Sequence, residues 1–210
     1  DYDMISKKDL SEQDIRTKFI TPAIEKAGWD RMTQLGEDVP LTDGKIFIRG
    51  NLFARGKLKR ADYVLYYKPN IPIAIIEAKD NNHSVRSGIQ QALGYRELLK
   101  DVPCVYSSNG DAFFEHDFTS ANGKIEREIS LDEFPTPEEL WKRYKKLNNI
   151  EEPQEITVAE QDYFYDSTGK KPRYYQQVAI NRIVEAIAKG QDRILLVLAT
   201  GTGKTYVAFQ

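Results

Sequence analysis

The sequence predicts an α/β protein with one complete domain followed by the beginning of a second. Three observations lead to this fold class. Apolar runs rich in β-branched and aromatic residues, at 44–50, 61–67 and 71–79, are separated by Gly, Pro and Asn, as strands are. Segments with the apolar periodicity of helices lie on both sides of them. Finally, the continuous apolar run 193–198 enters a glycine-rich turn, which is typical of a buried parallel strand.

The composition is that of a globular chain without a membrane span. No run of 18 or more residues is apolar and 30% of the residues are charged, so we expect a cytoplasmic protein with no membrane partner. The net charge of −2 neither predicts nor excludes nucleic acid as a partner. Cys104 is the single cysteine, which excludes an internal disulfide and a Cys-rich zinc module. Because the chain begins at Asp1 and stops at Gln210 inside an expected element, we expect it to be a fragment of a longer protein.

Two short helices are expected near the N-terminus. Ser11 is a good N-cap for the first, with Asp14 three residues further on. Thr21 and Pro22 are expected to restart the chain as the N-cap and first turn of a second helix, which Gly28 ends. The other expected elements, after the three apolar strands, are a helix over 84–100 capped by Ser84, a strand and turn over 102–110, a capped helix over 135–147, a polar linker over 148–170, an amphipathic helix over 173–190 ended by Gly190, and a strand over 193–198.

Asp62, Glu77 and Lys79 interrupt two strands that otherwise have the pattern of buried core. Counted from a hairpin turn centred between Pro69 and Asn70, the two acidic residues lie directly opposite each other. Lys79 shares the face of Glu77, because side chains alternate along a strand. Two opposed carboxylates repel each other, and in an apolar sheet they need a compensating cation. Mg²⁺ suits this role, since one or two carboxylates, water and a substrate phosphate can hold it. The hairpin therefore predicts a metal-dependent phosphodiester site.

This arrangement resembles the PD-(D/E)-x-K nuclease superfamily, whose motif is an Asp on one strand and a Glu-x-Lys on the next. Asp62, Glu77 and Lys79 match that motif. Gln91 and Tyr95 match the Gln-x-x-x-Tyr motif of the RecB-like branch, and on a helix they would be one turn apart on one face. The resemblance implies a central mixed sheet flanked by helices, with all five residues in catalysis.

The same resemblance implies metal ligands and a further acidic residue. Asp62, Glu77 and Ala78 would hold the metal ion. Members of the superfamily often carry an acidic residue on the first helix, a place that Glu12 or Glu25 can fill, with Glu12 preferred. The competing interpretation is an ordinary surface salt bridge within the Glu-x-Lys motif, which the hairpin register and the Gln-x-x-x-Tyr motif disfavour.

A second motif, "ATGTGKT" at 199–205, follows the last apolar strand in the order that a phosphate-binding loop requires. Backbone N–H groups of such a loop cradle phosphates, while Lys204 would reach the β- and γ-phosphates and Thr205 would reach Mg²⁺. Leu198 stands where the strict pattern has glycine, and this form is similar to that of superfamily 2 helicases and translocases. The resemblance implies ATP bound by Thr200, Gly201, Thr202, Gly203, Lys204 and Thr205.

Upstream of this loop, "RYYQ" looks like the glutamine motif of the same helicases and translocases. Gln176 would then read the edge of the adenine base, and Arg173 or Tyr174 would flank the base. The alternative is that Gln176 is an ordinary residue on a helix surface.

The order of the two motifs resembles that of the restriction subunit of Type I restriction-modification enzymes. Segments such as "IEAKDNN" and "PRYYQQVAINRIVEAI" look like its N-terminal region. The resemblance implies an endonuclease domain over 1–147, a linker over 148–170 and the truncated start of a RecA-like parallel α/β motor domain over 171–210. It further implies cleavage of double-stranded DNA after ATP-driven translocation, together with specificity and modification (methyltransferase) subunits. Two other interpretations stay open: a repair helicase-nuclease without methyltransferase partners, and a non-catalytic DNA-binding or assembly module.

Two basic segments are further candidates for DNA contact. Residues 54–60 would either lie near the scissile bond or form a solvated loop. Residues 142–147 are expected to be a solvated helix face rather than a DNA contact. No role is expected for His83, or for His116, which has no partner in the sequence pattern.

Overall fold

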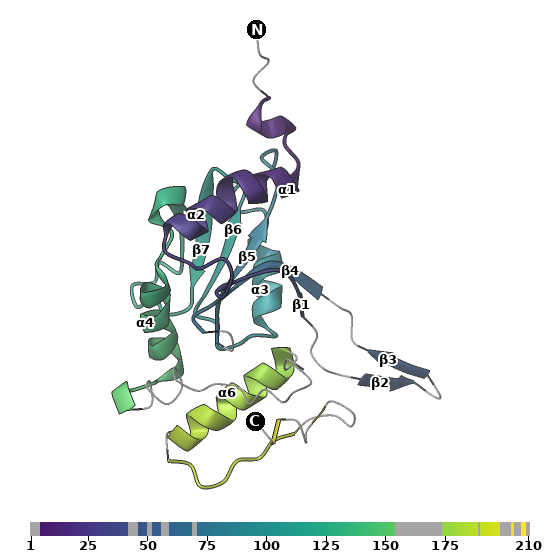
Figure 1. The fold of residues 1–210 in the computed structure, drawn as a ribbon, viewed down its shortest axis with the longest axis vertical. Helices are drawn as coiled ribbons and strands as arrows, with labels where there is room; N and C mark the ends of the chain where they lie inside the picture. Colours follow the sequence, from purple (N-terminus) through teal and green to yellow (C-terminus); the bar gives the residue numbers. More distant parts are fainter. Residues whose placement is uncertain are drawn as a thin grey trace. The chain divides into compact units, whose positions relative to one another are not determined.

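The structure of the 210-residue chain is a computed structural model (Figure 1). It describes residues 5–41, 46–49, 52–55, 59–68, 71–153, 174–188, 190–197, 203 and 207–208. The chain divides into two compact units. The first unit is made of Asp1–Val39 and Arg60–Asn148, and the second unit is made of Pro40–Lys59 and Asn149–Gln210.

A six-stranded sheet with helices on its connections forms the first unit, which confirms the predicted mixed α/β architecture. Its elements are η1 (Lys7–Asp9), α1 (Glu12–Ile15), η2 (Arg16–Ile20), α2 (Thr21–Lys26), β1 (Leu35–Leu41), β4 (Lys59–Tyr66), β5 (Pro72–Ala78), α3 (Ile89–Arg96), β6 (Cys104–Ser108), β7 (Ala112–Asp117), β8 (Glu126–Ser130), η3 (Leu131–Glu133) and α4 (Pro137–Asn148).

The sheet has the strand order β1-β4-β5-β6-β7-β8. The β4–β5, β6–β7 and β7–β8 pairs are antiparallel, whereas β5 and β6 are parallel. Every residue of β5 and β6 is buried. A strand that is covered on both faces has an unbroken apolar run instead of an alternating pattern, and the run at 71–78 is of this kind.

The hairpin of β4 and β5 has the predicted register. Tyr63 pairs with Ile76, and the same register one residue further places Asp62 opposite Glu77. A register shift follows Leu65, on the turn side, and leaves the pairing near Asp62 unchanged. The predicted position of Asp62 opposite Glu77 is therefore confirmed.

The helix that connects β5 to β6 is shorter than the sequence predicts. The helix α3 begins at Ile89 and not after Ser84, because Ser84 and Ser87 close a turn of their own. The N–H of Ser87 donates to the carbonyl of Ser84 at 3.1 Å, and their hydroxyl groups lie 2.9 Å apart. Gly88 then precedes the helix. The crossover through α3 is what a parallel pair of strands requires.

The N-terminal helices form one continuous helical run instead of two separately capped helices. Ser11 caps α1 with a capping box, as predicted. The chain then passes through the π-helical segment η2 directly into α2, so the prediction of Thr21 as an N-cap is wrong. The wider π-helical turn accommodates Pro22, whose ring would clash with a carbonyl four residues earlier in a regular helix. The hydroxyl of Thr21 instead lies 2.9 Å from the hydroxyl of Tyr63 on β4. Gly28, with φ of +101°, follows the helix end as predicted.

A buried carboxylate on β7 binds part of the basic segment of α4. Glu115 is 1% exposed, and it accepts hydrogen bonds from Tyr106 Oη at 2.8 Å, Arg127 Nε at 2.7 Å and Arg143 Nη1 at 3.0 Å. The expectation that 142–147 form a solvated face is thus wrong for Arg143. The arginine instead compensates a carboxylate that could not stay ionised alone in the core.

The strands β1, β3, β7 and β8 are not predicted from the sequence. Ile129 is the buried residue of β8, whose other residues are exposed, so no apolar run marks this strand. Pairing of β7 with β8 brings Nδ1 of His116 to 3.0 Å from Oε1 of Glu126. The expectation that His116 has no partner is therefore wrong, because the partner comes from an unpredicted strand.

The second unit contains the β2–β3 hairpin (Ile46–Arg49 and Leu52–Arg55) and the helix α6 (Tyr174–Ala188). The helix confirms the amphipathic helix predicted before Gly190, which has φ of +74°. Contrary to the prediction, residues 193–197 are not a strand, and Leu195 is 88% exposed. A strand needs neighbours for its hydrogen-bond ladder, and none of the strands that the structure describes pairs with this segment. In the described part of the chain, no helix is long and apolar enough to cross a bilayer.

Candidate active site

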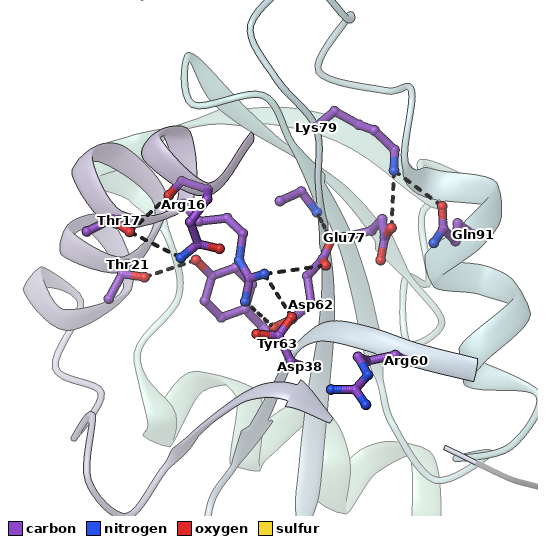
Figure 2. Close-up of polar contacts among 12 residues, drawn as sticks. Arg16, Thr17, Thr21, Asp38, Arg60, Asp62, Tyr63, Glu77, Lys79 and Gln91 are labelled. Carbon is purple, nitrogen blue, oxygen red and sulfur yellow. Dashed lines mark hydrogen bonds and ion pairs between the residues drawn. The ribbon is translucent and has the colours of Figure 1, made fainter. Parts of the chain in front are cut away.

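Asp62 is held in place by the neighbouring strand and by an arginine. Its Oδ2 accepts a hydrogen bond from the backbone N–H of Ala78 at 2.8 Å, and its Oδ1 lies 3.7 Å from Nη1 of Arg16. Nη2 of the same guanidinium donates to the backbone carbonyl of Asp62 at 3.1 Å (Figure 2). Both the main chain and the carboxylate of this half-buried residue are thus fixed.

Glu77 is the buried member of the carboxylate pair, with 3% of its surface exposed. Its Oε1 accepts a hydrogen bond from Nζ of Lys79 at 3.1 Å, which confirms that the two side chains share a face. Oε2 is buried and accepts no hydrogen bond from any residue that the structure describes. An ionised oxygen in this situation costs free energy unless a cation or donor reaches it. This atom therefore marks a place where a cation fits.

Gly88 packs closely against the side chains of Glu77 and Ser107. The N–H of Gly88 donates to Oγ of Ser107 at 2.8 Å. A Cβ atom on residue 88 would lie 2.8 Å from that oxygen and 2.9 Å from Cγ of Glu77. Only glycine lets the start of α3 approach β5 and β6 this closely.

Lys79 is linked to β4 through the two residues of the Gln-x-x-x-Tyr motif. Its Nζ donates to Oε1 of Gln91 at 3.3 Å (Figure 2). Nε2 of Gln91 donates to the hydroxyl of Tyr95 at 2.7 Å, and that hydroxyl donates to the backbone carbonyl of Arg60 at 2.8 Å. The predicted common face of Gln91 and Tyr95 is confirmed, and Lys79 is hydrogen-bonded to it through Gln91.

Burial and the nearby charge of Asp62 change the protonation of Glu77. Burial raises the pKa of Glu77 to about 8, and the negative charge of Asp62 adds to this rise, while Lys79 opposes it. Burial alone lowers the pKa of Lys79, but Glu77 outweighs that effect and the pKa is raised, so the ammonium stays charged. Near neutral pH and without a further cation, the pair of carboxylates therefore carries a proton.

Glu12 belongs to the same electrostatic environment. Burial raises its pKa, and the negative charge of Asp62 acts in the same direction, whereas Lys79 opposes it. Glu25 is an exposed residue on α2. Of the two acidic residues that the sequence leaves open, Glu12 is therefore the better candidate, because it interacts electrostatically with Asp62 and Lys79.

The donor set fits Mg²⁺. Among the described residues, no group of three or more His, Cys, Asp and Glu side chains could hold a metal ion. Mg²⁺ does not require one, because it usually binds through one or two carboxylates and keeps water or substrate phosphate as its other ligands. Asp62 and Glu77 supply two carboxylates across one strand pair, and Oε2 of Glu77 lacks a donor. Ala78 can contribute only its backbone carbonyl.

Arg16 is a functional candidate that the sequence analysis missed. Burial alone lowers its pKa, but hydrogen bonds with Asp38 and Tyr63 outweigh that effect and raise it, so the guanidinium is permanently charged. A signal for it exists in the sequence. Arg16 follows Ile15 and precedes Ile20 by one turn, on the helix face that the apolar periodicity assigns to the core.

The phosphate-loop predictions fall mostly outside the described residues. Gly203 is described, with φ of +84°, and its carbonyl accepts the N–H of Val207 at 3.2 Å, as at the start of a helical turn. Gln176 lies in the first turn of α6 and is 7% exposed. Of the residues named in the phosphate-loop and glutamine-motif predictions, those outside the described part are Arg173, Leu198, Thr200, Gly201, Thr202, Lys204 and Thr205.

The basic segment 54–60 stays a candidate for DNA contact. Lys59 and Arg60 are exposed at the start of β4, just before Asp62. Residues 56–58 lie outside the described part of the chain.

Two family models match the chain. The model described as the N terminus of the Type I restriction enzyme R protein matches residues 48–124, and the model described as the Type III restriction enzyme res subunit matches residues 169–210. The first match spans both Asp62 and the Glu-x-Lys motif, and the second spans the phosphate loop.

The curated relatives are endonuclease subunits. The endonuclease subunit of the Type I restriction enzyme EcoAI, from Escherichia coli, is 50% identical over 207 residues, which are 98% of this chain and 25% of the relative. The corresponding EcoKI subunit, from Escherichia coli strain K12, is 30% identical over 70% of this chain and 16% of the relative. The chain thus spans at most about a quarter of the length of these relatives.

A solved structure has the same fold. It is a fragment described as an HsdR subunit of a type I restriction enzyme from Vibrio vulnificus YJ016. The similarity has a TM-score of 0.76 at 39% identity and covers 96% of this chain and 37% of the other.

The close packing at Gly88 can be tested by adding one methyl group. We expect Gly88→Ala to lower the free energy of unfolding by about 1–3 kcal/mol, the usual cost of overpacking a buried site. Urea denaturation of the chain measures it. In the Ser107→Ala background, which lacks one of the two clashing atoms, the same substitution should cost less than in the unaltered chain. Unchanged stability of the single variant would contradict the packing described here.

The raised pKa of Glu77 makes stability depend on pH. An acid with a higher pKa in the folded chain destabilises folding as the pH rises from its ordinary pKa of 4.5 towards about 8. Glu77→Gln cannot ionise. Without divalent metal, we expect the difference in free energy of unfolding between this variant and the unaltered chain to change in favour of the variant by at least about 1 kcal/mol from about pH 5 to about pH 8.5. Urea denaturation with a chelator measures this, and a difference that stays constant with pH would refute the raised pKa.

Proposed function

We propose that this chain, which belongs to the N-terminal region of Type I restriction subunits, carries the Mg²⁺-dependent site that cleaves double-stranded DNA. The observation that supports the proposal most directly is the convergence of Asp62, Glu77 and Lys79 on one face of the β4–β5 hairpin. The 50% sequence identity between this chain and the EcoAI endonuclease subunit supports the proposal independently.

In this proposal the two carboxylates and the carbonyl of Ala78 hold Mg²⁺. When bound, the ion would supply the positive charge needed to activate water and to neutralise charge developing on the phosphodiester. Asp62 would contribute Oδ1, because its Oδ2 accepts the N–H of Ala78. Glu77 would contribute Oε2, which has no donor among the described residues. The proton that Glu77 holds without a cation would leave when the ion binds.

Lys79 is proposed to act on the phosphate and the nucleophile. Its charged Nζ is kept beside Glu77 by the hydrogen bond to Gln91, which Tyr95 fixes against β4. A positioned ammonium can stabilise the extra negative charge of the pentavalent transition state. Glu12 is proposed as an assisting acidic group, since its pKa responds to both Asp62 and Lys79.

The C-terminal segment is proposed to begin an ATP-driven motor domain. Its match to the res subunit model and the backbone of Gly203 support a phosphate loop over 200–205, with Gln176 at the adenine edge. The proposed domains are the nuclease over 1–147, a linker over 148–170 and the motor over 171–210. The whole protein would then translocate DNA in the cytoplasm together with specificity and modification subunits.

Removal of either carboxylate or of the lysine should stop cleavage without stopping the motor. We expect Asp62→Asn, Glu77→Ala and Lys79→Ala, made in the full-length protein with its partner subunits, to lower Mg²⁺-dependent plasmid cleavage at least about 100-fold. The reason is that each loses charge stabilisation in the transition state. ATP hydrolysis by the same complexes should persist.

Asp132→Asn is a matched control. It removes an exposed carboxylate on η3 that pairs with Lys26 of α2 at 2.8 Å, outside the elements that carry Asp62, Glu77 and Lys79. We expect cleavage by this variant to be unchanged. Normal cleavage by the Glu77→Ala and Lys79→Ala complexes would refute the nuclease site and favour a non-catalytic assembly or DNA-binding role.

A further inference from the structure

Arg16 joins the first helical run to the site through one buried guanidinium. Its side chain is 6% exposed. Nη1 lies 2.9 Å from Oδ1 of Asp38 and 3.7 Å from Oδ1 of Asp62, while Nη2 donates to the carbonyl of Asp62 at 3.1 Å (Figure 2). The guanidinium also lies over the ring of Tyr63, 4.9 Å from its centroid. The planar fork of an arginine is suited to such a set of partners, and an ammonium is not.

The fold alone does not explain an arginine at this position. Burying a charged group is costly, and a buried ion pair is often no more stabilising than apolar residues of similar size. Nε of Arg16 has no hydrogen-bond partner in the part of the chain that the structure describes, which adds to the cost. Its neighbours on the helical run, Ile15 and Ile20, are fully buried apolar residues. What distinguishes Arg16 from them is its contact with Asp62.

Asp38 holds the other side of the guanidinium. It lies on β1, which neighbours β4 in the sheet, and has φ of +51°, a conformation that aspartate adopts more readily than most residues. Half of its side chain is exposed. A solvated carboxylate gains little from a single ion pair, but here it fixes the plane in which Arg16 faces Asp62.

We infer that Arg16 is a positioning residue for Asp62, an inference that rests on the proposed nuclease function. The guanidinium fixes the main chain of Asp62 and places a permanent positive charge beside its carboxylate. Asp62 and Glu77 can then stay opposite each other before Mg²⁺ binds. The separation of 3.7 Å from Oδ1 leaves that oxygen free to ligate the ion. Partners that orient a metal ligand in this way commonly control metal affinity.

The test is the Mg²⁺ dependence of plasmid cleavage by the full-length protein in its complex. Arg16→Met keeps much of the apolar volume and loses the charge and the fork. Loss of such a partner costs about 10–100-fold in metal affinity or activity. We expect the half-saturating Mg²⁺ concentration to rise by about that factor, with Arg16→Lys intermediate because it keeps the charge alone. A merely structural role would scale the rate equally at every Mg²⁺ concentration.

Two further variants keep the test decisive. Asp38→Ala should raise the half-saturating concentration by less than Arg16→Met, and it should add nothing in the Arg16→Met background, because Asp38 acts through Arg16. Arg143→Met is the matched control: it removes another partly buried arginine that pairs with Glu115 at 3.0 Å, away from the site. We expect its half-saturating concentration to be unchanged. ATP hydrolysis verifies that each complex has a working motor, and urea denaturation of the chain verifies that each variant's nuclease unit is folded.

The outcomes separate the two claims. An unchanged half-saturating concentration in Arg16→Met would overturn the inference, and so would a lowered one, since Arg16 would then compete with the metal ion. Lys79→Ala in the same assay tests the function itself. If Lys79→Ala cuts normally the proposed function fails, whereas if it is inactive and Arg16→Met responds normally to Mg²⁺, only the inference about Arg16 fails.

Discussion

The site depends on the repulsion between two carboxylates that neighbouring strands bring face to face. Asp62 and Glu77 oppose each other in the middle of a buried sheet, where solvent screens charge weakly. Such a pair keeps both negative charges only if positive groups compensate them. The chain supplies Arg16 on the side of Asp62 and Lys79 on the side of Glu77. One oxygen, Oε2 of Glu77, stays without a donor among the described residues, and this leaves room for a third positive charge.

The two compensating cations differ in how they are held, and the difference fits their proposed roles. Arg16 is buried between Asp38 and Asp62, so its charge is fixed in place. Lys79 is partly exposed, with 21% of its side chain accessible, and a chain of hydrogen bonds through Gln91 and Tyr95 orients it. A buried charge suits the support of a metal ligand, whereas a partly exposed ammonium suits contact with a phosphate that arrives and leaves.

Much of the site could be predicted from the sequence because it depends on local rules. The opposition of Asp62 and Glu77 follows from the period of a strand and the position of the turn, and the shared face of Gln91 and Tyr95 follows from the helical period. The roles of Arg16 and Gly88 were not predicted, because they arise from contacts between different elements of the fold. The strand expected at 193–198 failed for a similar reason, since a strand exists only with its partners, whatever its own residues favour.

The central claim is that Asp62 and Glu77 are arranged for a divalent cation, and diffraction from crystals of this chain soaked in Mn²⁺ tests it most directly. Mn²⁺ replaces Mg²⁺ at sites built from carboxylate and carbonyl oxygens and gives an anomalous signal. The account predicts an anomalous peak bound by both Asp62 and Oε2 of Glu77. Crystals that contain Mn²⁺ elsewhere, with Oε2 of Glu77 still without a cation, would contradict it.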